Sequence, residues 1–486
     1  MTRTAKADPA ESDGPTMPAV RGAPATRGAP AVRGAPAIPS IPAVAAGRMR
    51  TRGHDRAVAS VRRMVAGRVP HAILISGPAG IGKTTLALDL AAGLLCDDPD
   101  SVARPCRACR GCRLVERGRH PDVHRLAPAG PGDQIRIGNR DRPEDGTVRR
   151  LASDLVLMSV EGGPRLAIIE RADRLTDDAQ TALLKTLEEP PAGVTIVLCA
   201  DDEDRLLPTV RSRSARIRLG PVATREIEAI LAESGVAEPP LAARLARISA
   251  GRPGAAHTLA RAPDAVAARD EIVRSLLDLL TATPAPRLAA VRDLTAMATD
   301  LARAIDRAAA ADEGTERGGA EPAKRGRGKA KGSTAGAAGD SPPAGSAAPS
   351  SADDEPTDDA DSAADPGTAK ASIPAAERRR AASVLVGLWR EVARDLLVVA
   401  LGEERQVRDP ALLDDLRDAA ANLDPPATNG SLPKAGPGPA ARTRRGAALG
   451  TFLGRLDSAG ELLEANVRPE LVLDTLLLHW PRAAAP

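Results

Sequence analysis

Between residues 48 and about 221, short apolar runs alternate with segments of helical periodicity. Three runs built almost wholly from Ala, Ile, Leu and Val predict buried strands at residues 72–76, 166–169 and 194–199. Apolar residues three or four positions apart predict helices at residues 58–65, 84–95, 148–159 and 177–189. Strands that alternate with helices are typical of a parallel sheet with crossover helices, so we expect an α/β domain here.

Residues 97–146 interrupt this alternation. They contain a cysteine cluster and then a stretch rich in Gly, Pro and Asp, a composition that predicts loops. After residue 221 the periodicity is helical only. We expect a small helical domain at residues 222–263 and a second all-helical domain formed by residues 264–311 and 375–482.

Two segments lack any pattern that could build a core. Residues 1–47 repeat Arg-Gly-Ala-Pro-Ala every six positions, and residues 312–374 are rich in Gly, Ala, Ser and Pro, with a basic half before an acidic half. Such segments cannot bury enough apolar surface to offset the entropy lost on ordering. We therefore predict a disordered tail and a disordered insertion.

Composition narrows the classes of function. The formal net charge of +3 over 486 residues is too small to indicate a polyanion-binding protein by overall charge. Tyr is absent and the aromatic residues are Trp389, Phe452 and Trp480, so the base-stacking platforms of single-strand binders are not expected. No apolar run reaches the ~18 residues that span a bilayer, and no signal-peptide core is present, which predicts a cytoplasmic protein.

A glycine-rich motif follows the first predicted strand and opens the next predicted helix. It matches G-x-x-x-x-G-K-[ST] and, with the following threonine, reads Gly77-Pro78-Ala79-Gly80-Ile81-Gly82-Lys83-Thr84-Thr85. The glycines let backbone N–H groups face a phosphate, and the helix dipole adds partial positive charge. Lys83 is the candidate ligand of the β- and γ-phosphates, and the Thr84 hydroxyl is a candidate Mg²⁺ ligand. The alternative is a chance match, which the flanking strand and helix disfavour.

A nucleotide-hydrolysing P-loop protein also needs a carboxylate at the end of a neighbouring strand. Glu170, directly after the second predicted strand, is the candidate. The next position, where hydrolytic relatives usually carry a glutamate that activates water, holds Arg171. Because a guanidinium cannot act as a general base, we expect ATP binding without efficient hydrolysis by this chain alone.

Four of the five cysteines lie within one short segment. Cys106, Cys109 and Cys112 are each three residues apart, and Cys96 comes at the end of the preceding predicted helix. Four thiolates favour a closed tetrahedral Zn²⁺ site; an iron–sulfur cluster and four unliganded thiols are the alternatives. Zinc binding is worth roughly 10–16 kcal/mol in small modules, enough to order such a loop. Cys199 lies in a predicted strand and should be an ordinary core residue.

Several further segments resemble the bacterial clamp-loader ATPases of DNA polymerase III, a family of AAA+ proteins. The resemblance is strongest in Ala182-Leu183-Leu184-Lys185-Thr186-Leu187-Glu188-Glu189-Pro190-Pro191, and it extends to Pro70-His71-Ala72 and Ser212-Arg213-Ser214. It covers residues 48–310 and, more loosely, 375–482. It implies an AAA+ P-loop domain at 48–221 with a zinc module at 96–112, a helical lid at 222–263, and a helical collar domain at 264–311 and 375–482.

Three departures make the chain more similar to the delta-prime subunit than to the ATP-hydrolysing gamma/tau subunit. Arg171 replaces the catalytic glutamate, and Gly254 lies where the motor subunit has an arginine that senses the γ-phosphate. Asp201 and Asp202 follow the third strand, where a motor subunit has a polar Thr or Asn. Since delta-prime subunits do not all have an intact P-loop, the resemblance leaves nucleotide occupancy open.

The resemblance implies a role for Arg213 as an arginine finger in the ATP site of a neighbouring motor subunit. A surface salt bridge is the alternative, because three more arginines crowd this segment. The implied protein belongs to a DNA-directed DNA polymerase holoenzyme without being the polymerase. It would help ATP-dependent loading of the sliding clamp onto primer–template DNA, with the gamma/tau and delta subunits as partners. The other hypotheses are a gamma/tau-type motor and an adaptor that recruits partners through residues 312–374.

Overall fold

The computed structural model describes residues 47–128, 133–140, 142, 144–317, 374–423, 439–465 and 467–482. Most of the expected tail and of the expected insertion therefore lie outside the described residues. At the insertion, helical backbone continues through Arg317, six residues beyond the expected end of the preceding helix.

Five parallel strands form one sheet, in the order β2-β3-β4-β1-β5. Their bounds are β1 (Ala72–Ser76), β2 (Val123–Leu126), β3 (Arg165–Ile169), β4 (Val194–Ala200) and β5 (Ala215–Arg218). Every residue of β1, β3 and β4 is buried, as expected for the inner strands of a sheet that is covered on both faces. The predicted parallel α/β architecture is confirmed.

The two outer strands were missed by the sequence pattern. β2 reads Val-His-Arg-Leu and β5 reads Ala-Arg-Ile-Arg, so neither is an apolar run. An edge strand pairs on one side only, and its solvent-facing positions carry charged side chains. The prediction of loops throughout residues 97–146 was wrong. This segment contains the edge strand β2 and also the helix α3 (Arg110–Glu116).

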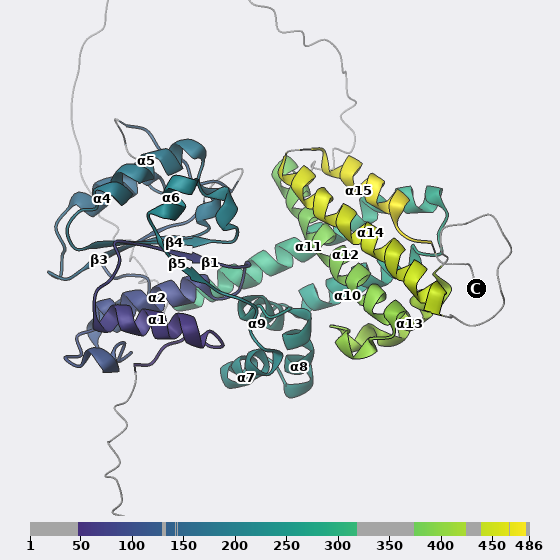
Figure 1. Cartoon of the computed structure of the whole chain (residues 1–486), viewed down its shortest axis with the longest axis horizontal. Helices are drawn as coiled ribbons and strands as arrows, with labels where there is room; N and C mark the ends of the chain where they lie inside the picture. Colours follow the sequence, from purple (N-terminus) through teal and green to yellow (C-terminus); the bar gives the residue numbers. More distant parts are fainter. Residues whose placement is uncertain are drawn as a thin grey trace, which may run out of the picture. The chain divides into compact units, whose positions relative to one another are not determined.

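Helices cover both faces of the sheet (Figure 1). One face carries α1 (Asp55–Ala66) and α2 (Lys83–Leu94), and the other carries α4 (Val148–Val156), α5 (Asp177–Glu188) and α6 (Pro208–Ser212). Successive strand residues point to opposite faces. Accordingly, Ile73 and Ile75 pack with α1 and α2, whereas Ala72 and Leu74 pack in the other core.

Three short helices follow the sheet: α7 (Thr224–Ser234), α8 (Pro239–Ile248) and α9 (Pro253–Arg261). Their buried apolar residues, including Ile227 and Leu245, belong to the same core as α1 and α2. The backbone N–H of Gly254, in the first turn of α9, donates a hydrogen bond to the carbonyl of Gly80 at 2.8 Å. These helices are therefore in direct contact with the glycine-rich loop.

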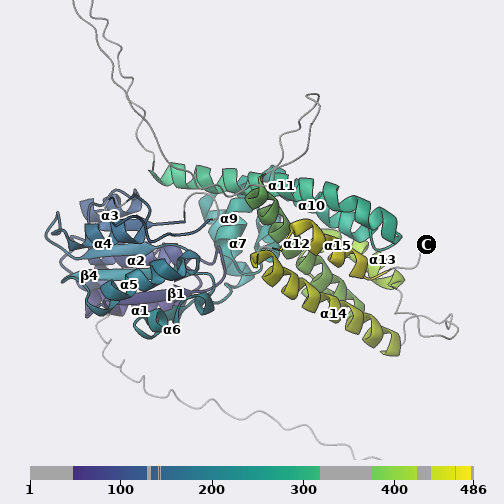
Figure 2. The ribbon, with the colours of Figure 1, turned by 90° about the horizontal axis from the view of Figure 1, so that it is seen from above.

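The described residues after α9 are mainly helical (Figure 2). Its helices are α10 (Pro263–Asp278), α11 (Pro284–Arg317), α12 (Ala375–Leu401), α13 (Leu413–Asn422), α14 (Pro439–Glu464) and α15 (Pro469–His479). The single helix expected from residue 264 to 311 is two helices, since Pro284 lacks the N–H that a helix interior needs and begins a new helix instead. None of the described helices is both long and apolar enough to cross a bilayer.

All three aromatic side chains of the protein pack together in this helical bundle. Trp389 of α12, Phe452 of α14 and Trp480 at the end of α15 have ring centroids 4.7–5.5 Å apart. The rings meet at interplanar angles of 51–78°, in the tilted or edge-on range that aromatic pairs prefer. This aromatic cluster joins α12 to the last two helices of the chain, α14 and α15.

A buried arginine binds the ends of two helices in the same bundle. Arg287 is 1% exposed, and its guanidinium donates five hydrogen bonds at 2.5–3.3 Å to backbone carbonyls. The acceptors lie at the carboxyl ends of α10 and α15: they are Leu279, Leu280, Leu477, Trp480 and Pro481. Carbonyls in the last turn of a helix lack intrahelical partners and carry partial negative charge, which the guanidinium satisfies.

A second set of buried charges connects α8 to the bundle. The carboxylate of Asp409, 1% exposed, accepts hydrogen bonds at 2.9–3.0 Å from Arg244 of α8 and from Arg269 of α10. Burial alone would raise the pKa of Asp409, but the two guanidinium groups lower it below its usual value. The pair of arginines therefore keeps this buried carboxylate ionised.

Candidate functional site

The glycine-rich loop, residues 77–84, connects the carboxyl end of β1 to the first residue of α2. Gly82 precedes the helix with φ at +106°, a backbone conformation that side chains other than glycine rarely adopt. Gly77 lies so close to the carbonyl oxygen of Leu219 that an added Cβ would be 2.4 Å from it. The free N–H groups at the start of α2 make this loop a fitting site for a phosphate.

The lysine of the loop is already saturated with acceptors. Lys83 is 7% exposed, and its ammonium donates to the carbonyls of Gly77 at 2.6 Å and Pro78 at 2.9 Å. Its third acceptor is Oδ1 of Asp201, at 2.5 Å. An ammonium has three N–H donors, so no donor of Lys83 remains for a phosphate unless one of these bonds breaks.

Asp201 is fixed in this position by its surroundings at the end of β4. Its backbone N–H donates to Oδ1 of the buried Asp173 at 2.7 Å. Its second carboxylate oxygen, Oδ2, lies 4.0 Å from Nε of Arg171, whose guanidinium also pairs with Asp133 at 2.5 Å. The sequence pointed to Asp201 only as a departure from a motor subunit; its contact with Lys83 emerges from the fold.

The predicted metal-binding carboxylate is also paired. Oε1 of Glu170 accepts hydrogen bonds from Nε and Nη2 of Arg125 at 2.7 and 2.6 Å. Arg125 comes from β2, the strand that the sequence pattern missed, so no sequence signal identified this partner. A metal ion at Glu170 would have to displace or share this carboxylate with a guanidinium.

A buried thiol lies among these charges. Burial raises the pKa of Cys199, on β4, to about 12, and the charges of Glu170, Asp201, Lys83 and Arg125 also act on it. Its full burial agrees with the prediction that Cys199 is a core residue.

The backbone of this site fits a nucleotide, but two of its charged side chains do not. The loop backbone and the start of α2 fit a phosphate group, and Thr84 and Thr85 stand in the first turn of that helix. The two charged side chains that would bind the γ-phosphate and Mg²⁺, Lys83 and Glu170, are paired within the protein instead. Gly254 also packs closely against the loop, because a Cβ at this position would lie 3.0 Å from the Gly80 carbonyl oxygen.

The four clustered cysteines converge on one point, as predicted. The sulfur atoms of Cys96, Cys106, Cys109 and Cys112 all lie within 4.8 Å of one another. The backbone N–H groups of the last three donate to the sulfurs of Cys96, Cys106 and Cys109 respectively, each at 3.4 Å. This arrangement can hold a metal ion.

The protein environment treats the thiols differently. A hydrogen bond from the Ala108 N–H is the main cause that lowers the pKa of Cys106 to about 7. Burial raises the pKa of Cys96, and it raises that of Cys112 well above the usual range. A bound metal ion would lower the pKa of the buried thiols, because a thiol that coordinates a metal is deprotonated.

The cysteine segment is anchored to α2 by close backbone packing and by buried charge. A Cβ added to Gly111 would lie 2.1 Å from the carbonyl oxygen of Leu95, so only glycine fits there. The guanidinium of Arg107 binds Asp89, a fully buried carboxylate that also accepts the N–H of Thr51 at 2.8 Å. The four thiols are therefore held at the end of the same helix that begins at the glycine-rich loop.

Arg213 lies at the opposite edge of the sheet from the glycine-rich loop. It follows α6 and precedes β5, whose first residue, Ala215, pairs with Ile73 near the start of β1. The loop begins at Gly77, four residues further along β1, which corresponds to a separation of about 13 Å along the strand. The exposed guanidinium of Arg213 pairs with Glu188 of α5 at 2.6 Å and donates to the Thr209 carbonyl at 3.1 Å.

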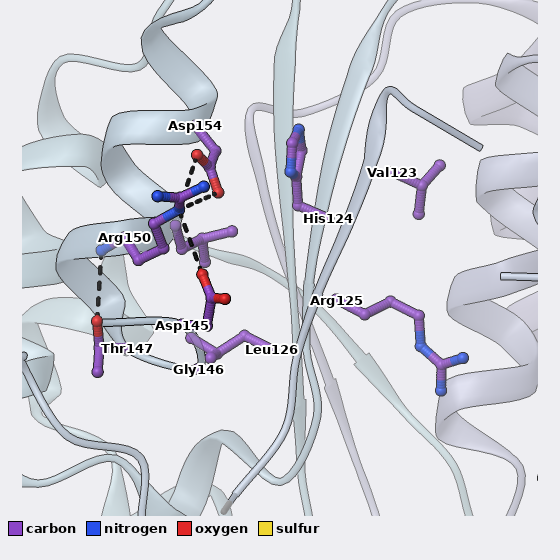
Figure 3. Close-up of a pocket in the computed structure, with 10 residues that line it drawn as sticks. Val123, His124, Arg125, Leu126, Asp145, Gly146, Thr147, Arg150 and Asp154 are labelled. Atoms are coloured by element: carbon purple, nitrogen blue, oxygen red, sulfur yellow. Dashed lines mark hydrogen bonds and ion pairs between the residues drawn. The ribbon is translucent and has the colours of Figure 1, made fainter. Parts of the chain in front are cut away.

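A surface hollow of about 330 Å³ lies between β2 and α4 (Figure 3). Its charged residues pair with each other: Arg150 lies 3.6 Å from Asp145 and 3.2 Å from Asp154. Figure 3 shows Arg125 extending from β2 to the side away from this group. The hollow therefore has no unpaired charge aimed at a ligand and is separate from the phosphate loop.

Part of the chain matches a known family. Residues 54–223 match the family described as DNA polymerase III, delta subunit. The DNA polymerase III subunit delta' of Escherichia coli is 37% identical over 195 residues, which cover 40% of this chain and 55% of that protein. The delta' subunit of Bacillus subtilis is 34% identical over 37% of this chain and 51% of its own length. The chain thus spans about half the length of these relatives.

Other subunits of DNA polymerase III are similar to this chain at a comparable level. The tau subunit of Salmonella typhimurium is 35% identical over 183 residues, which cover 37% of this chain and 27% of that protein. Among solved structures, a gamma subunit-related protein of Thermotoga maritima covers 54% of this chain and 91% of its own, at 17% identity and a TM-score of 0.28. An overlap of that quality adds nothing to the description of the fold.

Proposed function

We propose that this chain is a subunit of the DNA polymerase III clamp loader, and specifically its delta-prime subunit, because residues 54–223 match the DNA polymerase III, delta subunit family and two delta' subunits are 34–37% identical to part of the chain. In this role it helps ATP-dependent loading of the sliding clamp onto primed DNA during chromosomal replication. The gamma/tau and delta subunits are its proposed direct partners. The clamp and the primer–template DNA are reached through the complex, and any contact with DNA should be phosphate-directed and salt-sensitive.

The position of Arg213 is the observation that carries this proposal. It stands about 13 Å or more along the sheet from the glycine-rich loop of its own chain, so it is not part of that loop's own site. It is exposed, and Glu188 and the Thr209 carbonyl hold it in place. An arginine that is oriented at the surface, away from its own phosphate loop, suits a finger that completes the ATP site of a neighbouring subunit.

The chain's own phosphate loop supports a passive subunit. Arg171 occupies the position that would activate water, and a guanidinium cannot accept a proton there. Lys83 binds Asp201 in place of a phosphate. The proposed subunit therefore contributes an arginine to a motor neighbour and turns over little ATP itself.

The structural parts have proposed roles of their own. The AAA+ domain, residues 48–221, presents Arg213, and residues 222–263 form the lid. The helices of residues 264–311 and 375–482 form the collar that holds the subunits together. The four-cysteine site is proposed to bind Zn²⁺ as a structural ion, because four thiolates with no open position fit that metal.

The test is a loader reconstituted with the Arg213→Ala variant. An arginine finger can contribute ~10³–10⁵ in rate by stabilising charge on the transferred phosphoryl group. Turnover at the neighbouring motor site should therefore fall at least ~10³-fold, and DNA-stimulated clamp loading should fall with it. Arg216→Ala is the matched control, since Arg216 is equally exposed and its nearest carboxylate, that of Glu203, is 4.0 Å away.

Wild-type ATP turnover and clamp loading with Arg213→Ala would show that the finger assignment is wrong. Assembly must be measured on the same sample by native mass spectrometry. A variant that fails to enter the ring would indicate an interface role for the Arg213–Glu188 pair instead.

The alternative function is a gamma/tau-type motor. The complete glycine-rich loop and the 35% identity to a tau subunit favour it. A motor would hydrolyse ATP as the purified chain and lose that activity on Lys83→Ala. The passive subunit predicts no turnover that depends on Lys83, so this measurement separates the two functions directly.

A further inference from the structure

Both charged side chains that a P-loop protein uses for Mg²⁺-bound triphosphate are paired internally in this chain. Lys83 binds Asp201, and Glu170 binds Arg125. Lys83 begins α2 and Arg125 lies on β2, whereas Glu170 and Asp201 directly follow β3 and β4 at the carboxyl edge of the sheet. In each pair the partner side chain has the same sign of charge as the part of the ligand that would otherwise bind there: Asp201 is an anion like the γ-phosphate, and Arg125 is a cation like Mg²⁺.

We propose that Asp201 and Arg125 are resident counter-ions, with the Asp201 carboxylate in place of the γ-phosphate and the Arg125 guanidinium in place of Mg²⁺. The phosphate loop is thereby held closed without nucleotide. This inference rests on the proposed function of a passive subunit and supplies its structural cause. It concerns ATP binding by this chain alone, not the role of Arg213.

The geometry at Asp201 argues for replacement of a phosphate. A carboxylate oxygen accepts from the Lys83 ammonium at 2.5 Å, and because both groups are charged this is a charge-assisted hydrogen bond, about twice as strong as a neutral one. The other two donors of the ammonium bind carbonyls of the loop itself. A γ-phosphate at this place would compete for the same donor and would meet a like charge on Asp201.

Asp201 is also prevented from turning away. Its backbone N–H is bound by the buried carboxylate of Asp173 at 2.7 Å, and its second oxygen faces Arg171 at 4.0 Å. The arginine that replaces the water-activating residue therefore stabilises the carboxylate that occupies Lys83. The two departures from a motor subunit act on one ion cluster.

The geometry at Glu170 argues for replacement of the metal. Two N–H groups of Arg125 bind the same carboxylate oxygen at 2.6 and 2.7 Å. Both side chains are mostly buried, at 22% and 17% exposure, so solvent screens this pair only in part. Mg²⁺ needs carboxylate or phosphate oxygens and dehydrates reluctantly, so it competes poorly for a carboxylate that is already paired.

The experiment measures ATP binding to the full chain by isothermal titration calorimetry, with Mg²⁺ and with EDTA. Asp201→Asn removes the resident anion and should bind ATP at least about tenfold more tightly than the wild type in EDTA, a change of ~1.4 kcal/mol. The double variant Lys83→Ala/Asp201→Asn should lose this gain. Asp204→Asn is the matched control: it removes the same charge three residues away, where the carboxylate pairs with Arg211.

Arg125→Gln tests the second counter-ion. Mg²⁺ should raise the ATP affinity of this variant at least threefold, while the wild-type affinity should change less than twofold between Mg²⁺ and EDTA. Circular dichroism on the same samples checks that each variant is folded. Asp201→Thr provides a second neutral substitution if Asp201→Asn unfolds.

Equal ATP affinity in the wild type, Asp201→Asn and Asp201→Thr would overturn the role of Asp201. A wild-type chain that binds ATP tightly only with Mg²⁺ would overturn the proposal whatever the variants do. Loader activity is not used as a readout. A failure of the Arg213 test and a failure of the counter-ion test are therefore independent results.

Discussion

The buried guanidinium of Arg287 allows a stability prediction that can be worked out from its contacts. It is 1% exposed and donates five hydrogen bonds to carbonyls at the ends of α10 and α15. Burial is the main cause that lowers its pKa to about 10, with a contribution from Arg482, so the group is charged at neutral pH. All five of these acceptors are backbone carbonyls, so the helix ends supply the compensating negative charge.

Arg287→Met keeps much of the side-chain length but removes all five donors. Each hydrogen bond from a charged donor contributes ~1.5–3 kcal/mol, and each buried acceptor left without a partner costs ~1–3 kcal/mol. The desolvation cost of a buried cation, several kcal/mol, is relieved by the same change and offsets much of that sum. We expect the free energy of unfolding to fall by ~3–5 kcal/mol, comparable to breaking other buried charge interactions.

The assay is guanidinium chloride unfolding of the full chain, followed by far-ultraviolet circular dichroism. Hydrogen exchange on the same variant should show the loss in the peptides of α10, α11 and α15. Arg287→Lys retains three of the five donors and should recover part of the loss. Arg292→Met, at an exposed position on the same helix, should stay within ~0.5 kcal/mol of the wild type. A loss below ~1 kcal/mol for Arg287→Met would refute the reasoning, because it would be little larger than the ~0.5 kcal/mol expected of a surface substitution.

Three further predictions follow from buried contacts elsewhere. Asp409→Asn should lower the free energy of unfolding at pH 7. Because the folded pKa of Asp409 is depressed, its contribution is present above the unfolded value near 4 and is lost as pH falls through the folded pKa, so the difference in the free energy of unfolding between wild type and variant should shrink steadily as the pH is lowered below ~4. A difference that does not shrink with falling pH would show that the ion cluster is not its source. The purified chain should contain one Zn²⁺ per molecule by elemental analysis. Cys112→Ser should reduce the zinc content at least tenfold, whereas Cys199→Ser should leave it unchanged. Equal zinc content in both variants would contradict the assignment. Gly111→Ala should destabilise the cysteine segment by more than ~1 kcal/mol and speed zinc loss to a chelator, because its Cβ would meet the Leu95 carbonyl at 2.1 Å, whereas Gly163→Ala, with 4.0 Å of clearance, should release zinc at the wild-type rate.

The inner strands of the sheet and the glycine-rich loop were predictable from sequence because their signals are local. A buried run such as 72–76 must be apolar on both faces, and the loop must carry glycine where φ is positive, as at Gly82. The convergence of the four cysteines was predictable for a similar reason. Three-residue spacing brings Cys106, Cys109 and Cys112 to one side of a turn.

The charges that decide how the site works were not predictable in this way. Asp201 lies 118 residues from Lys83, and Arg125 lies 45 residues from Glu170 on an edge strand without an apolar pattern. Ion pairs of that separation depend on strand order, which brings β2 beside β3 and β4 beside β1. The sequence identified Arg171 and Asp201 as departures, whereas their shared ion cluster required the fold. The buried position of Arg287 had no sequence signal at all.

Because Trp389, Phe452 and Trp480 all lie in the helical bundle, every tryptophan emitter of this protein reports on one region. Both tryptophans are buried, so tryptophan fluorescence will follow unfolding of the bundle and will not respond to events at the phosphate loop. A single tryptophan introduced into α1 would therefore add a fluorescent reporter to the α/β domain, which has no tryptophan of its own. Unfolding of the α/β domain would then contribute to the fluorescence signal beside unfolding of the helical bundle.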